Sequence, residues 1–216
     1  LMLIKGDLAK AGDYQAQADR LAGDQLGTLL TGGELALRRG DLAQALDRFT
    51  RADKLYPGNI AAMMNKASVL GDLGRFDQME QVLGPLAAAA PKDPTVVYLQ
   101  ARLAQSRQDW NGIKTLVQPV EAGLDPQDPT RLVYADALTH LGQAQQAAAQ
   151  AAPIARANPS NRIALKVLAE AQLAGGDASA AAETYRPVGT AATARSEEKA
   201  LYARIAQAAG DPAATA

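Results

Sequence analysis

The stretch 80-EQVLGPLAAAAPKDP-94 has the pattern of an amphipathic helix, yet it carries a Gly84-Pro85 pair inside it. Proline lacks a backbone donor and clashes with the carbonyl four residues before it, so the pair costs a helix interior roughly 3–4 kcal/mol. Further prolines follow at intervals of 34 residues, at Pro119, Pro153 and Pro187. The helix breaker is therefore part of an internal repeat, and a fixed period of this length determines the architecture.

Glycines mark the same period. They stand at Gly6, Gly40, Gly74, Gly142, Gly176 and Gly210, with Gln108 in the one remaining place. After five of them an Asp follows within three residues, as in GDLAKA, GDLAQA, GRFDQM, GDASAA and GDP. Glycine ends a helix in the left-handed conformation, and Asp accepts hydrogen bonds from the free N–H groups of the next helix. The register predicts a helix–turn–helix in each repeat.

A second set of turn signals lies about 17 residues after the glycines, at 56–59 (YPGN), 90–94 (APKDP), 125–129 (DPQDP) and 158–161 (NPSN). Between the two sets, apolar residues recur at helical spacing, as in Leu42, Ala45, Leu46, Phe49 and Ala52. This spacing predicts two helices of about a dozen residues in each repeat.

The pattern resembles the tetratricopeptide repeat family, which combines a bulky residue, a small pair, an alanine, an aromatic residue and a closing proline over about 34 residues. Residues 26–59 match through Leu29, Gly32, Gly33, Ala36, Gly40, Asp41, Ala45, Phe49, Ala52 and Pro57. Units 60–93, 94–127, 128–161 and 162–195 match in part. In unit 94–127 the closing proline is moved by one residue to Pro126. Partial units occupy 1–25 and 196–216.

The resemblance implies an all-α fold, a right-handed α-solenoid of antiparallel helix pairs forming a single array over residues 1–216. The first helix of each pair would line the concave side. Pro85, Pro119, Pro153 and Pro187 would each lie about two turns into a second helix, facing away from the groove. There they either kink the helix around the convex surface or form a hinge or a notch for a partner.

Composition argues against most catalytic chemistry. The chain has a net charge of −1, no cysteine and a single histidine, so a convergent nucleophile, histidine and carboxylate set is not expected. Asp136 and His140 are one helical turn apart and form a predicted surface pair. Glu197 and Glu198 are interpreted as a solvated helix start. We expect no enzyme activity, no cofactor, no metal, no nucleic-acid partner and no membrane span.

Two aromatic residues are candidates for contacts with a partner. Trp110 starts a second helix where Leu42 and Phe76 stand in earlier repeats, which favours a packing role. Tyr98 falls on the concave side of a first helix, one turn before Arg102, which allows a contact role.

The groove geometry of the family places two rows of side chains across successive units. The first row holds Glu34, Ser68, Arg102, Asp136, Glu170 and Arg204. The second holds Leu30, Met64, Tyr98, Leu132, Lys166 and Ala200. One row is mostly charged and the other mostly apolar, which suits a peptide with both types of side chain, although a solvated groove without a ligand is the alternative.

Asp136 is expected to steer Arg102 within the first row. Some family members hold a carboxylate with a clamp of lysine and asparagine at these row positions. This sequence does not match the clamp, because Lys166 is followed one turn later by Glu170, and Met64 is followed one turn later by Ser68.

The function expected from the resemblance is a non-catalytic scaffold that binds a protein or peptide in the groove. Two alternatives are a segment of a bacterial envelope export or exopolysaccharide assembly scaffold, and a regulatory arm of a larger enzyme. Because residue 1 is Leu, the sequence is expected to be part of a longer chain. Its high Ala, Gln and Arg content and its ends resemble long bacterial repeat proteins of the envelope scaffold kind. This resemblance slightly favours the bacterial periplasm or cell envelope over the cytoplasm, while the compartment stays open.

Overall fold

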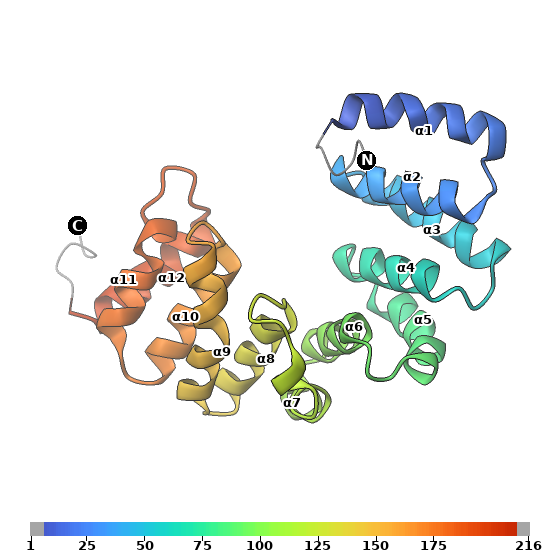
Figure 1. The fold of residues 1–216 in the computed structure, drawn as a ribbon. Helices are drawn as coiled ribbons and strands as arrows, with labels where there is room; N and C mark the ends of the chain where they lie inside the picture. Colours follow the sequence, from blue (N-terminus) through green and yellow to red (C-terminus); the bar gives the residue numbers. More distant parts are fainter. Residues whose placement is uncertain (1–6, 211–216) are drawn as a thin grey trace. The chain divides into compact units, whose positions relative to one another are not determined.

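The computed structural model describes residues 7–210, which fold into helices joined by short turns without any strand (Figure 1). They form two compact units, one ending at Leu103 and one starting at Ala104. The first unit contains α1 (Leu8–Ala22), α2 (Leu26–Arg38), α3 (Leu42–Leu55), α4 (Ile60–Asp72), α5 (Phe76–Ala89) and most of α6 (Pro94–Ser106). The second contains α7 (Trp110–Val117), the 3-10 turn η1 (Glu121–Gly123), α8 (Thr130–His140), α9 (Ala144–Ala157), α10 (Arg162–Ala174), α11 (Ala178–Gly189) and α12 (Ser196–Ala208).

Helices pack on their neighbours along the chain. In the first unit α1 packs on α2, α2 on α3, α3 on α4 and α4 on α5. In the second unit α7 packs on α8, and each later helix packs on the next, with α8 also contacting α10. Nearest-neighbour packing of helix pairs is the defining property of a solenoid, so the predicted all-α solenoid class is confirmed.

The turns inside the repeats follow the glycine register. Gly40 has a φ of 74°, and the N–H of the next residue, Asp41, donates to the Ala36 carbonyl at 2.9 Å. The same bond is made by Arg75 to Leu70, Asp109 to Ala104, Gln143 to Leu138 and Asp177 to Gln172. This is the Schellman arrangement, which satisfies carbonyls at the helix end. Gln108, in the non-glycine place, adopts the same left-handed conformation with a φ of 57°. Gly6 lies outside the described residues.

Aspartates cap the helices that follow these turns. The Asp41 carboxylate accepts from the Gln44 N–H at 2.9 Å, and Asp109 and Asp177 make the equivalent bonds before α7 and α11. The predicted caps are confirmed at these sites. After Gly74 the N-cap is Arg75 without a side-chain bond, and Asp77 lies in the first turn. There its charge complements the helix dipole instead.

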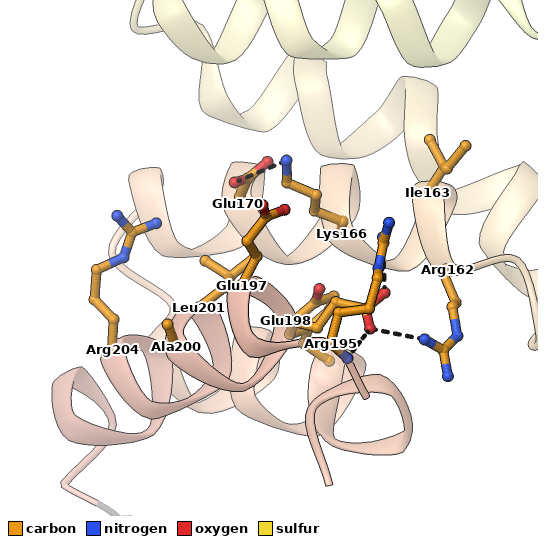
Figure 2. Close-up of a pocket in the computed structure, with 11 residues that line it drawn as sticks. Arg162, Ile163, Lys166, Glu170, Arg195, Glu197, Glu198, Ala200, Leu201 and Arg204 are labelled. Carbon is orange, nitrogen blue, oxygen red and sulfur yellow. Dashed lines mark hydrogen bonds and ion pairs between the residues drawn. The ribbon is translucent and has the colours of Figure 1, made fainter. Parts of the chain in front are cut away.

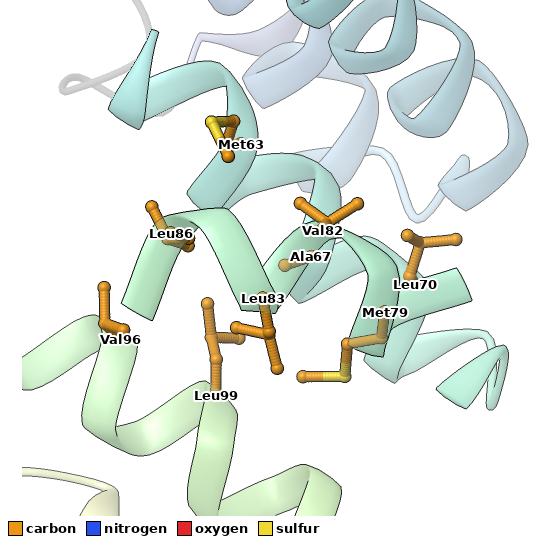
Figure 3. Close-up of a cluster of buried hydrophobic side chains, with 9 residues drawn as sticks. All are labelled: Met63, Ala67, Leu70, Met79, Val82, Leu83, Leu86, Val96 and Leu99. Atoms are coloured by element: carbon orange, nitrogen blue, oxygen red, sulfur yellow. The ribbon is translucent and has the colours of Figure 1, made fainter. Parts of the chain in front are cut away.

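Small residues allow first and second helices to approach closely. Ala67, Ala101, Ala135 and Ala169 share one register position and are fully buried. In the first repeat the position is Gly33, where even a methyl group would overlap the buried Phe49 ring. The core of the first unit then continues through the buried cluster of Figure 3, which comprises Met63, Ala67, Leu70, Met79, Val82, Leu83, Leu86, Val96 and Leu99.

Three of the four repeated prolines lie inside second helices, as expected. Pro85, Pro153 and Pro187 belong to α5, α9 and α11. Each removes the N–H that would bond the carbonyl four residues earlier. Those carbonyls belong to exposed residues, at Gln81, Ala149 and Glu183. Water can hydrogen-bond exposed carbonyls, so the prolines cost less there than in a buried helix.

The fourth proline does not fit this expectation. α7 ends at Val117, so Pro119 follows the helix and lies in the turn leading to η1. The residues after Pro85 are LAAAA, which re-form a helix, whereas VEAGLDP after Pro119 contains a β-branched residue, a glycine and a second proline. The prediction that Pro119 lies within its second helix was wrong for this reason.

Arg131 on α8 holds the segment after α7 in place. Its guanidinium donates to the backbone carbonyls of Leu124 at 2.7 Å, Asp125 at 2.9 Å and Glu121 at 3.3 Å. It also donates to the Gln150 side chain at 2.6 Å, and Gln150 donates in turn to the Glu121 carboxylate. The Glu121 and Asp125 carbonyls also accept from the backbone N–H groups of Leu124 and Asp128, so Arg131 adds a donor to these two and supplies the donor for the Leu124 carbonyl.

The register shows how unusual this arginine is. The equivalent residues in the other four complete units are buried and apolar, at Leu29, Met63, Val97 and Leu165, whereas the partial unit 196–216 has the exposed Lys199. One repeat thus replaces an apolar core residue by an arginine where its second helix is shortened.

Candidate functional site

In the first unit, two of the predicted groove residues contact each other on α6. The Arg102 guanidinium lies 5.7 Å from the centre of the Tyr98 ring, which is within cation–π range. Arg102 also forms an ion pair of 2.9 Å with Asp72 at the end of α4. A Cβ atom at Gly71 would lie 3.3 Å from the Arg102 Nη1 atom, so the small residue there leaves room for the guanidinium. Arg102 is thereby held with about a fifth of its side chain exposed.

The remaining predicted residues of the first unit lie on α2 and α4. Glu34 is exposed and pairs with Arg38 one turn later at 3.1 Å. Ser68 is half-buried. Met64 and Tyr98 are half-buried and pack against the core cluster of Figure 3, while Leu30 packs against Ala36 and its neighbours. The apolar row is therefore also the edge of the core, which fixes the positions of its side chains.

In the second unit, predicted residues from three helices influence one carboxylate. Burial raises the pKa of Glu170 on α10, Asp136 on α8 raises it further, and Lys166 and Arg204 lower it. Lys166 lies 3.9 Å from Glu170, a long ion pair. The predicted register of Asp136, Glu170 and Arg204 thus corresponds to an electrostatic row across α8, α10 and α12. Leu132, also predicted, is half-buried on α8.

A hollow of about 460 Å³ lies between α10 and α12 and brings four predicted residues together. Lys166, Glu170, Ala200 and Arg204 line it. Figure 2 shows Lys166 and Glu170 on one wall and Arg204 on the other. The lining also includes residues that sequence reasoning did not select: Arg162, Ile163, Tyr185, Arg195, Glu197, Glu198 and Leu201.

Glu198 is the charged centre of this hollow. Its side chain is only 5% exposed, and it accepts from the Arg195 backbone and side chain and from Arg162 Nη1 at 2.7 Å. These hydrogen bonds lower its pKa from 4.5 to about 2, the Arg195 backbone bond contributing most. The expectation of a solvated helix start was therefore wrong for Glu198, because two arginines neutralise it in a buried position, and holds for the exposed Glu197.

Asp136 and His140 form the pair predicted from their spacing. His140 Nε2 lies 3.6 Å from Asp136 Oδ1, and Asp136 also accepts from Gln105 Nε2 at 2.6 Å. The contact between His140 and Trp110 was not predicted. The two rings stack with centres 4.1 Å apart and an interplanar angle of 6°. Trp110 is half-buried, so it covers the histidine ring as well as its own helix start.

Candidate metal ligands are not clustered in the part of the chain that the structure describes. Residues 7–210 contain no group of three or more histidine and acidic side chains placed to hold a metal ion. Within the same range no helix is long and apolar enough to cross a membrane.

A second hollow, of about 780 Å³, lies in the first unit beside α3, α4 and α5. Its lining includes Gln81 and Pro85, together with the ion pair of Lys66 and Asp53 at 2.8 Å. The notch alternative for the repeated prolines thus corresponds to a real depression at Pro85.

Comparison with known proteins identifies the repeat. Residues 36–103 match the family model of the tetratricopeptide repeat. A tetratricopeptide repeat protein from Parabacteroides merdae superimposes with a TM-score of 0.70 and 19% identity, covering 99% of this chain and 84% of that one. A thermophilic protein of this class from Thermus thermophilus gives 0.65 and 18% identity, covering 85% of this chain and 100% of that one.

A third solved structure has a binding site in its description. YrrB, described as a TPR protein with an unusual peptide-binding site, gives a TM-score of 0.53 and 12% identity, covering 93% of this chain and 94% of that one. At these identities the likeness concerns the fold. No curated protein matches the sequence.

Proposed function

Because residues 36–103 match the tetratricopeptide repeat and the chain shares the fold of such proteins, we propose that it is a non-catalytic scaffold that binds a protein or peptide on its first-helix face. The first-helix face is the side presented by α2, α4 and α6 in the first unit and by α8, α10 and α12 in the second. Peptide binding is a described property of the structurally similar YrrB, which supports this class of function for the fold.

The observation that carries the proposal is the Tyr98–Arg102 pair. Tyrosine and arginine are enriched among the residues that dominate binding energy at protein interfaces. Here Tyr98 is anchored by the core cluster and Arg102 by Asp72. Both side chains are therefore held in place before a partner arrives, so less conformational entropy is lost on binding.

The charged residues of the second unit extend the proposed surface. Lys166, Glu170 and Arg204 line an open hollow rather than a packed core, and Lys166 keeps about half of its side chain exposed. An extended or helical segment with both charged and apolar side chains suits such a surface.

Site-specific photo-crosslinking tests this proposal. A crosslinking residue at position 68, in the charged row of α4, is expected to capture a partner from an extract of the source organism. The same residue at position 54, on the exposed side of α3, should not capture it. The captured protein must then bind the purified chain, and Tyr98→Ala must weaken that binding.

Lys54 is a suitable control because it lines neither of the two hollows described above. Gln81 tests the alternative site, because it lines the hollow at Pro85. Capture from position 81 but not from position 68 would instead favour the proline notch as the binding site.

A further inference from the structure

Two arginines share one carboxylate at the start of α12. Arg162 Nη1 lies 2.7 Å from Glu198 Oε2, and Arg195 Nη2 lies 3.1 Å from Glu198 Oε1. The exposed Glu197 lines the same hollow and also acts on Arg195. Over the whole hollow, the four cationic side chains of Arg162, Lys166, Arg195 and Arg204 face the three carboxylates of Glu170, Glu197 and Glu198, which leaves one positive charge in excess. Glu198 stays ionised throughout the neutral range, because its hydrogen bonds to Arg195 and Arg162 favour the charged form.

The exposed fractions of the three side chains show that the positive charge can be reached by a ligand. The Glu198 side chain is 5% exposed, whereas Arg162 is 37% and Arg195 is 74% exposed. The carboxylate is thus covered, and Figure 2 shows it between the two guanidinium groups. A guanidinium carries five N–H donors, and these interactions occupy only some of them.

An apolar side chain stands beside the arginines. Ile163 follows Arg162 in the first turn of α10, lines the same hollow and is 66% exposed. A ligand that covered it would bury apolar area.

The length of the hollow indicates the kind of ligand. Its lining on α10 runs from Arg162 to Glu170, which at 1.5 Å per residue is about 12 Å. An extended chain rising about 3.3 Å per residue would place roughly four residues along it. This length suits a stretch of polypeptide rather than a single terminal group.

We infer that the Arg162–Arg195 pair above Glu198 binds an acidic side chain of an extended partner segment, with an aliphatic neighbour of that side chain packed on Ile163. The inference rests on the proposed function and adds the chemistry of the partner. The carboxylate of the segment supplies the second negative charge between the two guanidinium groups, where charge-assisted hydrogen bonds are strong.

Capped peptides test the inference without knowledge of the natural partner. The first is a short peptide, blocked at both ends, in which glutamates flank a leucine. The second replaces the glutamates by glutamines. A third is the glutamine peptide with a free C-terminal carboxylate. Titration of the full chain, followed by the NMR signals of the arginine Nε–H groups, gives the affinity for each.

The glutamate peptide is expected to bind about tenfold more tightly than the glutamine peptide, as charge-assisted hydrogen bonds imply. Its affinity should fall as salt is added. Arg195→Gln should weaken it about three- to fivefold, in keeping with an exposed charge pair. Ile163→Ser should also weaken it, through lost apolar burial. The matched control is Lys199→Gln, which removes an exposed charge from the same helix outside the hollow and should leave the affinity unchanged.

Equal affinity for the glutamate and glutamine peptides would overturn the inference. So would equal binding of the glutamate peptide and the glutamine peptide with a free C-terminus, because that result would assign the site to a chain end. A loss of affinity in Lys199→Gln as large as in Arg195→Gln would also overturn the inference, because the preference for the glutamate peptide would then be explained by the overall charge of the chain. These experiments do not involve Tyr98 and Arg102 in the first unit. The proposed function is tested separately, by the crosslinking experiment and by Tyr98→Ala, so the two can fail independently.

Discussion

Arg131 Nη1 donates a hydrogen bond of 2.6 Å to Gln150 Oε1, and through it the guanidinium connects α8, α9 and the segment that follows α7. The same guanidinium satisfies three backbone carbonyls between Glu121 and Asp125. At the equivalent position the other four complete units have leucine, methionine or valine. A substitution toward the usual residue of the repeat is therefore expected to harm the fold here.

Arg131→Leu should lower the free energy of unfolding by about 2–4 kcal/mol, because it removes the side-chain donor of the Leu124 carbonyl and of Gln150 Oε1 and a second donor from the Glu121 and Asp125 carbonyls. Chemical denaturation measures the change. The control is Met63→Leu, at the same repeat position in the first unit, which conserves volume and should cost less than about 1.5 kcal/mol. Wild-type or higher stability for Arg131→Leu would show that the arginine is dispensable.

Gln108→Gly should stabilise the chain by about 0.5–1 kcal/mol. Gln108 has a φ of 57°, a conformation that costs side-chain-bearing residues roughly 1–2 kcal/mol, and glycine relieves this at some cost in unfolded-state entropy. Gly142→Ala, at the corresponding turn with a φ of 73°, should destabilise by a similar amount. Thermal or chemical unfolding that showed the same sign for both variants would contradict the strain argument.

Gly33→Ala should destabilise the first unit by about 1–3 kcal/mol, because the added methyl group overlaps the buried Phe49 ring. Gly27→Ala is the control on the same helix. A Cβ atom there has no neighbour within 4 Å, so the higher helix propensity of alanine should leave stability unchanged or raise it by up to about 1 kcal/mol. If urea denaturation gave the two variants equal midpoints, close packing at Gly33 would not explain its presence.

Glu198→Gln should lower the thermal midpoint at pH 7, and the difference from wild type should narrow as the pH falls. The folded pKa of Glu198 is about 2, below its ordinary value of 4.5, so its contribution to stability is present above pH 4.5 and lost on approach to pH 2. Calorimetric scans at pH 7 and pH 3 test this. The exposed neighbour provides the control, since Glu197→Gln should change the midpoint little at either pH. If the thermal midpoints of Glu198→Gln and wild type differed by the same amount at both pH values, the lower stability of the variant would come from packing rather than from the charge of Glu198.

The repeat architecture could be predicted because its signals are local. A glycine followed by an aspartate sets one turn and one cap within a few residues, and Gly40 with Asp41 behaves as predicted. The small residue before Phe49 was also visible in the sequence, since its register position is alanine in four later repeats. Regular spacing therefore determined the helices, most of their ends and the packing of their small residues.

Features that depend on several distant residues could not be predicted in the same way. The early end of α7 depends on Arg131 and Gln150 as well as on Pro119. Glu198 is buried because Arg162, 36 residues before it, reaches its carboxylate. The local contribution comes from Arg195, whose backbone N–H donates to Glu198, the third residue of α12, and it depends on where that helix starts. For Arg131 a signal existed, because an arginine in a column of apolar residues indicates a special partner.

The central claim is that the partner binds to the first-helix face. Titration calorimetry with the purified partner that crosslinking identifies tests this claim most directly. Tyr98→Ala and Arg102→Ala should each weaken binding by about 1–3 kcal/mol, while Lys54→Ala on α3 should change it by less than about 0.5 kcal/mol. Circular dichroism should show that all three variants remain folded. Unchanged affinity for both α6 variants, together with loss of binding on substitution of Gln81 or Pro85, would contradict the claim and assign binding to the notch.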